Sequence, residues 1–396
     1  MSNTLTDRSR IIAYQTCPRK RFLEYHSRNT GVRNSKVNIY TSTGSMVHTG
    51  VEHILLGKDI EESIDISLEE HEKEVKDKLY ALDENEDQQF VYNEQRALGE
   101  SLIRVYNKVQ YPRILQEYEV LEVEKEILYP LTDNITLMSK PDAIFRSKES
   151  GSLVVYSLKT ASKWDDTSQK QFKYDIQGIS ELVATEYLLG EEVESIKMDF
   201  LIKGSRQVLK DSNSGGNKKI QNSFLIHPYM FDTGLSQEFN LKYTKSKGWN
   251  RVNIWEVMSI REWVDYLFSN RYDDLVGTGE DNSKVIVSPA PYYRSLEDIE
   301  NWIQQARYQE ETINRSLETL QMECKELVGP REGVNPSFYR LSINRLFPQN
   351  RQNCFNYGGF CSYVDICWNG LRTDSSEYEA RVPHHETELV QISKGE

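Results

Sequence analysis

Alternating apolar and polar positions predict strands in the middle of the chain. Residues 120–129, 135–146 and 153–160 are rich in β-branched and aromatic side chains, and short polar turns separate them. Residues 193–203 continue this pattern with apolar side chains at every second position. The first three segments predict a meander of neighbouring strands, and the fourth extends the same sheet.

Apolar residues at helical spacing predict helices on both sides of these strands. Residues 166–189 carry a stripe that we expect to be buried, formed by Phe172, Ile176, Ile179, Val183 and Tyr187. A helix is expected to begin soon after Gly44, residues 58–118 are charged and helical in pattern, and residues 296–327 predict a long amphipathic helix. Helices and strands together predict an α/β (α+β) fold.

These patterns divide the chain into five parts. We expect a helical region over residues 1–118, a core over 119–204, an insertion or sheet extension over 205–290, a helix and cysteine-rich region over 291–370, and a disordered tail over 371–396. The tail is assigned as disordered because its sequence after Thr373 is acidic and polar.

Composition narrows the functional classes. The 396 residues carry a formal net charge of −13, which argues against general coating of nucleic acid but allows a local basic groove. No stretch approaches the ~20 apolar residues that a membrane span requires, and the first ten residues are polar. We therefore expect a soluble, intracellular (cytoplasmic) protein. No phosphate-binding loop of a helicase motor is present.

The cysteines form a pattern that spans the chain. One cysteine lies near the start and three lie near the end: Cys17, Cys354, Cys361 and Cys367. Five cysteines do not make a disulfide framework at this length, so a clustered set favours metal ligands. The spacings lack the paired Cys-x-x-Cys knuckles of structural zinc, but zinc and unrelated buried thiols remain alternatives. Cys324 has no partner in this pattern.

Polar residues on the predicted strands and helices supply candidate chemistry. Asp142 follows Pro141 on one strand, while Ser157 and Lys159 share a face of the next because side chains alternate along a strand. Two further pairs lie one helical turn apart, Gln177 with Glu181 and His48 with Glu52.

The Pro-Asp step at Asp142, the lysine at Lys159 and the following helix with Gln177 resemble the PD-(D/E)XK nuclease superfamily. The four cysteines, with Gly44 followed four residues later by His48, resemble its RecB-like branch, which includes AddB and the CRISPR-associated RecB-like exonucleases. The resemblance implies a restriction-endonuclease-like core sheet flanked by helices, with a nuclease core over 119–204. It also implies chain ends joined by a 4Fe-4S cluster.

The resemblance also implies roles for individual residues. It implies that Asp142, Lys159 and Gln177 are the catalytic residues. It also implies that Mg²⁺ or Mn²⁺ is held by His48, Asp142, the carbonyl of Leu158 and Glu181. The iron-sulfur ligands are Cys17, Cys354, Cys361 and Cys367. Ser157 stands where the family normally has Asp or Glu. Glu181, Glu52 or no residue at all could replace that acid, and the sequence leaves these three possibilities open.

The implied function is a metal-dependent DNA nuclease, an exonuclease in DNA processing or recombination. Ser157 favours an alternative, a catalytically inactive DNA-binding or assembly subunit that keeps the fold and the cluster. An RNA-directed or regulatory nuclease-like protein is the third possibility. The expected partners are DNA and a helicase or other recombination protein, and no membrane is expected.

Overall fold

The structure is a computed structural model. It describes residues 4–35, 39–83, 86–162, 164, 166–203, 243–246, 249–252, 258–270, 285–324, 336–356, 359–383 and 385–394. Most of the expected insertion over 205–290 therefore lies outside the described residues. Among the described helices, none combines the length and the apolar character needed to cross a membrane.

A five-stranded sheet lies at the centre of the fold. Its strands, in the order β11-β8-β7-β6-β3, are Ile286–Val287, Val193–Ile202, Leu153–Ala161, Ala143–Ser147 and Tyr118–Val123. β6 pairs antiparallel with β7, with Ala143 opposite Tyr156, and β7 pairs parallel with β8 along its whole length. β7 is therefore covered on both edges and forms the middle of the sheet.

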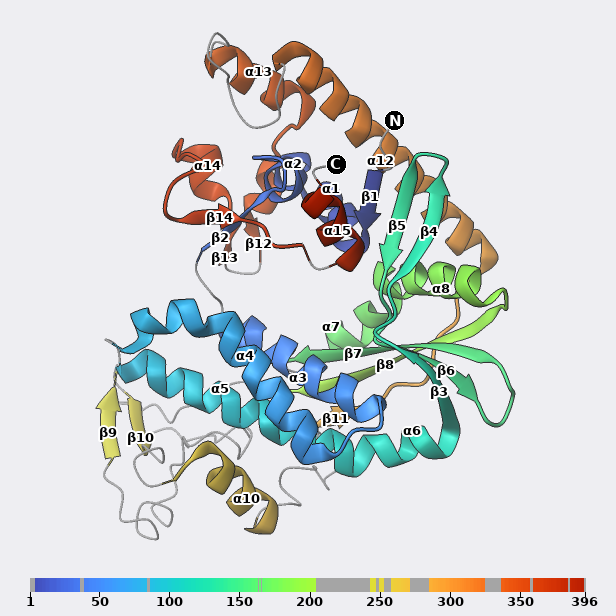
Figure 1. Cartoon of the computed structure of the whole chain (residues 1–396), viewed down its shortest axis with the longest axis vertical. Coiled ribbons are helices and arrows are strands. Elements are labelled where there is room, and N and C mark those ends of the chain that lie inside the picture. Colours follow the sequence, from blue (N-terminus) through green and yellow to red (C-terminus); the bar gives the residue numbers. More distant parts are fainter. Residues whose placement is uncertain are drawn as a thin grey trace.

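Helices cover both faces of this sheet (Figure 1). Val155 and Ile144 pack in one apolar cluster with α8 (Ile176–Leu189). Tyr156 and Leu158 point the other way, into a second cluster with α3 (Ile39–Leu55) and α5 (Glu86–Val105). The two-residue alternation along β7 thus separates the two cores, and it places Ser157 and Lys159 on the α8 face.

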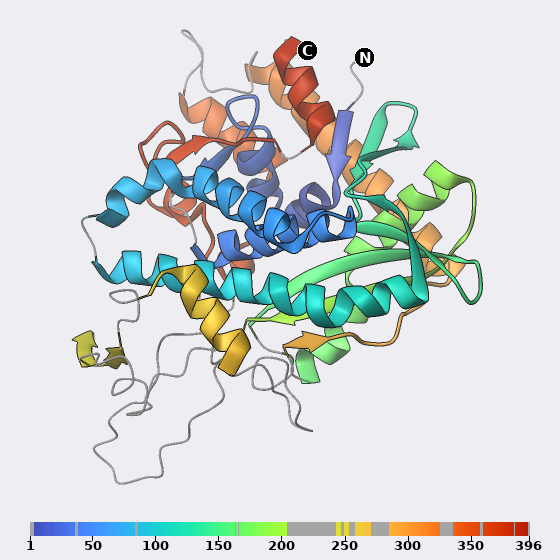
Figure 2. The same ribbon diagram turned by 60° about the horizontal axis from the view of Figure 1, so that its bottom comes forward.

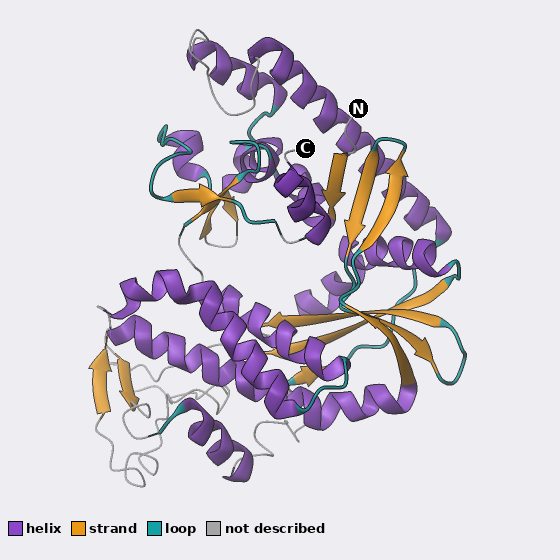
Figure 3. Ribbon diagram, viewed as in Figure 1, coloured by secondary structure: helices purple, strands orange, loops and turns teal. Residues whose placement is uncertain are grey.

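A second sheet changes the predicted meander. Its strands, in the order β1-β5-β4, are Thr4–Asp7, Ile135–Ser139 and Ile127–Thr132, and they form an arm beside the central sheet (Figure 3). The expected strands over 120–129 and 135–146 are each divided between the two sheets. The predicted order of antiparallel neighbours is confirmed, because β3 pairs with β6, β4 with β5 and β6 with β7, but the expectation of one continuous sheet is wrong. Pro141, which has no N–H for a strand ladder, lies between β5 and β6.

The expected helix over 166–189 is also interrupted. It consists of α7 (Asp166–Gln171), a 3₁₀ turn (Phe172–Tyr174) and α8. Asp175 begins α8, because its side chain accepts a hydrogen bond from the N–H of Gln177 at 2.9 Å. Tyr187, predicted to be buried, is 56% exposed.

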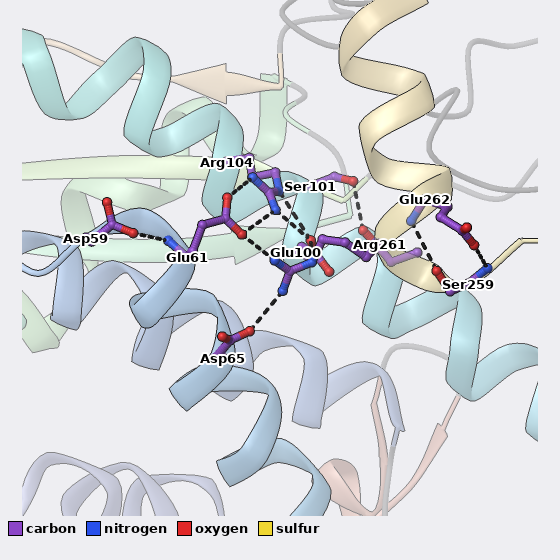
Figure 4. Close-up of polar contacts among 10 residues, drawn as sticks. Asp59, Glu61, Asp65, Glu100, Ser101, Arg104, Ser259, Arg261 and Glu262 are labelled. Carbon is purple, nitrogen blue, oxygen red and sulfur yellow. Dashed lines mark hydrogen bonds and ion pairs between the residues drawn. The ribbon is translucent and has the colours of Figure 1, made fainter.

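A helical arm extends the α3 face of the sheet. It contains α4 (Ile60–Asp83), α5, a π-helical turn (Tyr106–Gln110), α6 (Tyr111–Glu117) and α10 (Ile260–Asn270). Arg261 of α10 contacts Glu61, Asp65 and Glu100 from α4 and α5, and Arg104 shares Glu61 and Glu100 (Figure 4). These ion pairs hold α10 against α4 and α5. A separate hairpin is formed by β9 (Tyr243–Ser246) and β10 (Trp249–Val252).

The two chain ends build a third region together (Figures 1 and 2). The N-terminal part contributes α1 (Arg8–Thr16), α2 (Pro18–Tyr25) and β2 (Val32–Asn34). The C-terminal part contributes α12 (Leu296–Cys324), α13 (Pro336–Leu346), β12 (Phe355–Asn356), β13 (Gly359–Phe360), α14 (Val364–Trp368), β14 (Tyr378–Ala380) and α15 (Glu386–Lys394). The ends therefore share one apolar cluster, in which Phe22 and Phe347 rings lie 4.7 Å apart.

The expectation of a disordered tail over 371–396 is wrong for its described residues. β14 pairs antiparallel with β2, and Glu388 of α15 contacts both Arg10 and Arg381. Glu126, from the turn before β4, accepts the N–H groups of residues 386 and 387 at the start of α15. The tail is ordered because distant parts of the chain supply partners for its polar groups.

A buried ion pair between α2 and α12 yields a stability prediction. Arg21 donates to Glu310 at 2.9 Å, and both side chains are fully buried. Burial lowers the pKa of Arg21, and Glu310 opposes that effect. Glu310→Leu strands a buried charge and is expected to destabilise the fold by about 3–5 kcal/mol, measured by urea unfolding.

The double variant Arg21→Met with Glu310→Leu is expected to recover most of that loss, because neither charge then remains buried alone. Arg315→Met is the control, since this exposed arginine pairs with Glu311 on the same helix and should change stability by less than about 0.5 kcal/mol. A double variant as unstable as Glu310→Leu alone would show that the pair is not the source of the effect.

Candidate active site

The β6–β7 pairing places Asp142 beside the end of β7. Its Oδ2 accepts a hydrogen bond from the backbone N–H of Leu158 at 2.5 Å. Lys159 follows Leu158, and the side chains of these two residues point to opposite faces of β7. The positive charge of Lys159 lowers the pKa of the Asp142 carboxylate. The strand pairing thus brings together the acid and the lysine that the sequence analysis expected to be close.

α8 completes this group with two side chains. Glu181 Oε2 accepts from the hydroxyl of Ser157 at 2.6 Å, and its Oε1 accepts from Gln177 Nε2 at 2.5 Å. The Oε1 atom of Gln177 accepts from Lys159 Nζ. Glu181 is 2% exposed, so this carboxylate fills the space beside Ser157 inside the protein.

His48 reaches the same point from α3. Its Nδ1 lies 3.6 Å from Asp142 Oδ1. Gly44, one turn earlier, lies against β7, because a Cβ at this position would meet the Thr160 hydroxyl at 3.0 Å. The glycine therefore permits the close approach of α3 that carries His48 to Asp142.

The pKa values of Glu181 and Asp142, the two carboxylates of the site, shift in opposite directions. Burial raises the pKa of Glu181 to about 7, the charge of Asp142 adds to this shift, and Lys159 opposes it. Burial also opposes ionisation of Asp142, but His48, Lys159 and the Leu158 N–H together lower its pKa to about 2. Two carboxylates thus lie close together in a buried site, and a bound cation would reduce the repulsion between them.

Glu124 is a neighbour of the site that the sequence analysis did not single out. It follows β3 with φ +49°, its N–H donates to the carbonyl of Asp142 at 3.1 Å, and its Oε2 lies 2.6 Å from Lys140 Nζ. Burial and the charge of Asp142 raise its pKa to about 7. No local periodicity marks such a residue, since its position depends on a turn between two sheets.

The geometry separates the two candidates for the missing acid. Glu181 bonds to Ser157 directly, whereas the charge of Glu52 acts on Glu124 and Lys140. Within the described residues, no three His, Cys, Asp or Glu side chains are already arranged to hold a metal ion. Carboxylate oxygens and an imidazole nitrogen nevertheless fit Mg²⁺ or Mn²⁺ in donor type.

A cavity of about 340 Å³ lies beside these side chains. Gln177 and Glu181 line it from α8, Arg8 from the start of α1, and Arg381 from the C-terminal segment. Arg8 also donates to Gln177 Oε1, the oxygen that accepts from Lys159. The sequence analysis missed Arg8 and Arg381, because long-range packing of the chain ends brings both residues here.

Four thiols meet in a hollow at the far end of α1. The hollow is lined by Cys17, Cys354, Cys361 and Cys367, together with Lys20, Asn350 and Tyr363. All five cysteines of the chain are free thiols. Cys324 does not line the hollow but lies in the apolar cluster of the chain ends, against which Cys361 and Cys367 also pack. Burial raises the pKa of Cys367 to about 11, and the other three thiols add to this shift.

α1 connects the two sites directly. It begins with Arg8 at the active-site cavity and ends with Thr16, whose carbonyl accepts from the side chains of Asn350 at 3.2 Å and Asn353 at 2.6 Å. The N–H of Asn350 donates to Cys17 Sγ at 3.2 Å. One rigid helix therefore fixes the position of the four-thiol hollow relative to the candidate active site.

Comparison with known proteins identifies the class to which this site is similar. Residues 8–191 match the model of the PD-(D/E)XK nuclease superfamily, and the mixed α/β architecture agrees with that fold. The matched segment contains His48, Asp142, Ser157, Lys159, Gln177, Glu181 and Cys17. No curated protein matches the chain. The matched superfamily is one of nucleases, which usually use Mg²⁺ or Mn²⁺.

The bond between Ser157 and Glu181 yields a prediction. Ser157→Ala removes the donor to Glu181 Oε2 and leaves a buried carboxylate oxygen without that hydrogen bond. We expect a loss of about 1–3 kcal/mol, measured by urea unfolding at neutral pH. Ser316→Ala is the control, because its hydroxyl bonds only a carbonyl of its own helix, and it should cost less than about 1 kcal/mol. Equal effects of the two variants would contradict a special role for the contact.

Proposed function

We propose that the protein is a metal-dependent DNA nuclease of the RecB-like branch, an exonuclease that acts in DNA processing or recombination. The convergence of Asp142, Lys159, Gln177 and Glu181 beside the ends of β6 and β7 carries this proposal. The superfamily match supports phosphodiester hydrolysis as the reaction class. DNA is the proposed substrate, and a helicase or other recombination protein is the proposed partner.

In this proposal each residue has one task. His48, Asp142, the carbonyl of Leu158 and Glu181 would hold the metal ion. When bound, Mg²⁺ or Mn²⁺ polarises the phosphate and lowers the pKa of a bound water. Lys159 donates a hydrogen bond that orients the attacking water toward phosphorus. Gln177 fixes the ammonium group of Lys159 through its Oε1 atom, and histidine in the ligand set favours Mn²⁺ as activator.

Glu181 is the proposed replacement for the acid that Ser157 lacks. The hydrogen bond from Ser157 holds one oxygen of Glu181 at the position that a strand carboxylate would otherwise occupy. The other oxygen is held by Gln177, so its orientation is fixed before a metal ion arrives. A carboxylate from a neighbouring helix thereby supplies the charge that the strand does not.

We also propose a 4Fe-4S cluster at Cys17, Cys354, Cys361 and Cys367. The four thiols share one hollow, and thiolates are ligands of both zinc and iron-sulfur clusters. The cysteine spacings lack the Cys-x-x-Cys knuckles of structural zinc, which supports the cluster.

The alternative is a catalytically inactive DNA-binding or assembly subunit with the same fold and cluster. Both oxygens of Glu181 already accept hydrogen bonds from protein groups, and this observation favours the alternative. A metal ion must compete with Ser157 and Gln177 for that carboxylate. Measured cleavage decides between the two functions.

Asp142→Asn and Lys159→Ala test the proposed catalytic roles. Each is expected to lower Mn²⁺-dependent degradation of labelled DNA by at least about 100-fold, since metal binding and water orientation contribute several kcal/mol. The iron-sulfur absorbance should be unchanged. Lys170→Ala, an exposed lysine on α7, is the control and should retain full activity.

Protein with an intact cluster that degrades neither single-stranded nor double-stranded DNA in Mn²⁺ would contradict the nuclease proposal. The inactive-subunit alternative would then stand, provided that the same protein binds DNA. Activity that survives in both variants would instead contradict the assignment of these residues.

Cys17→Ser tests the cluster. It is expected to lower bound iron and acid-labile sulfide and to reduce the thermal midpoint, because the cluster joins the two chain ends. Cys324→Ser is the matched control, since this cysteine is buried away from the hollow, and it should retain iron. Equal iron in the two variants, or zinc with no sulfide in the unmodified protein, would contradict the proposal.

A further inference from the structure

Each of the three late cysteines has an exposed aromatic residue as its sequence neighbour, and their exposed fractions are 57% for Phe355, 71% for Phe360 and 50% for Trp368. The cysteines line the four-thiol hollow, whereas their aromatic neighbours in the sequence are exposed and do not line it. Arg351, which lies over the Trp368 ring, belongs to the turn Arg351–Cys354 that leads directly into Phe355. Phe355, Phe360 and Trp368 are called the aromatic platform below.

Two of the platform rings contact each other, and the third ring contacts a cation. The rings of Phe355 and Phe360 lie edge to face on the β12–β13 hairpin, with centroids 4.9 Å apart. The Arg351 guanidinium lies 5.2 Å from the centroid of the Trp368 ring. Within the described part of the chain, Arg351 forms no ion pair with a carboxylate. The platform therefore offers both ring surfaces and an uncompensated positive charge.

The surroundings of the platform indicate the chemistry of its occupant. Among the described residues next to the rings, Gln352 and Gly359 are exposed and offer no large apolar side chain to a protein partner. Lys20 lines the adjoining hollow, where it pairs with Glu24 at 3.7 Å, so Arg351 is the cation that the platform itself supplies. Separate aromatic rings next to cations match the way proteins bind single-stranded nucleic acid, in which bases stack on rings and phosphates meet positive charge.

We propose that Phe355, Phe360 and Trp368, with Arg351, form a base-stacking site for single-stranded nucleic acid. The inference rests on the proposed nuclease function only in assigning the bound strand as substrate. α1 spans the distance from the thiols to the active site with nine residues, which is about 13 Å. A strand bound at the platform would extend from this end of α1 toward the candidate active site at the other end.

The test measures binding without cleavage. All proteins carry Asp142→Asn, and fluorescence anisotropy reports the affinity for a labelled single-stranded 20-mer and for the duplex of the same sequence. Phe360→Leu and Trp368→Leu keep apolar surface but remove the aromatic ring. Each is expected to weaken single-strand binding about 5- to 100-fold, and duplex binding less than twofold, because duplex bases are already stacked.

Two controls separate stacking from other effects. Phe360→Tyr keeps an aromatic ring and should keep the affinity, whereas Tyr187→Leu, an exposed ring at the end of α8 that packs on Tyr129, should change nothing. The replaced side chains are exposed, and equal thermal midpoints confirm folding. Trp368→Leu, on a separate element, provides an independent measurement.

Unchanged single-strand affinity in both leucine variants would overturn the proposal, and so would an equal loss for the duplex or no single-strand binding by the parent. Cleavage is assayed separately in protein with Asp142 intact. Single-strand binding that depends on the platform, without any cleavage, would contradict the nuclease proposal and leave the stacking site standing. Cleavage together with single-strand binding that does not depend on the platform would support the nuclease proposal and contradict the stacking site.

Discussion

The antiparallel pairing of β6 with β7 is the constraint on which the candidate site depends. It sets Asp142 against the N–H of Leu158 and directs Ser157 and Lys159 toward α8. A shift of one residue would turn the lysine into the opposite core, so the apolar positions of both strands fix the chemistry together with the register. α8 contributes Glu181, whose pKa is raised to about 7 by burial and by Asp142, while Lys159, Ser157 and Gln177 oppose this shift.

The same site is held in place by the ends of the chain. α1 carries Arg8 to Gln177, and its other end lies at the four thiols. Buried ion pairs fasten this region, with Arg21 bonded to Glu310 and Arg10 to Glu388. A link between segments more than 300 residues apart restricts the unfolded chain strongly, so a cluster there would stabilise the whole molecule.

Local patterns predicted the parts of the site that depend on one element at a time. Period two along β7 put Ser157 and Lys159 on one face, and one helical turn put Glu181 beside Gln177. The division of the meander between two sheets was missed, because strand pairing is not a local property. Arg8, Glu124 and the ordered tail were missed for the same reason, since residues far away in sequence supply their partners.

The central proposal is that Glu181, a carboxylate on α8, replaces the acid that β7 lacks at Ser157. Anomalous scattering from Mn²⁺ in a crystal of the protein tests it most directly. We expect a Mn²⁺ ion at about 2.0–2.6 Å from oxygens of both Asp142 and Glu181. An ion bound through Glu124 or Glu52 while Glu181 stays bonded to Ser157 and Gln177, or no ion at Asp142 at all, would contradict it.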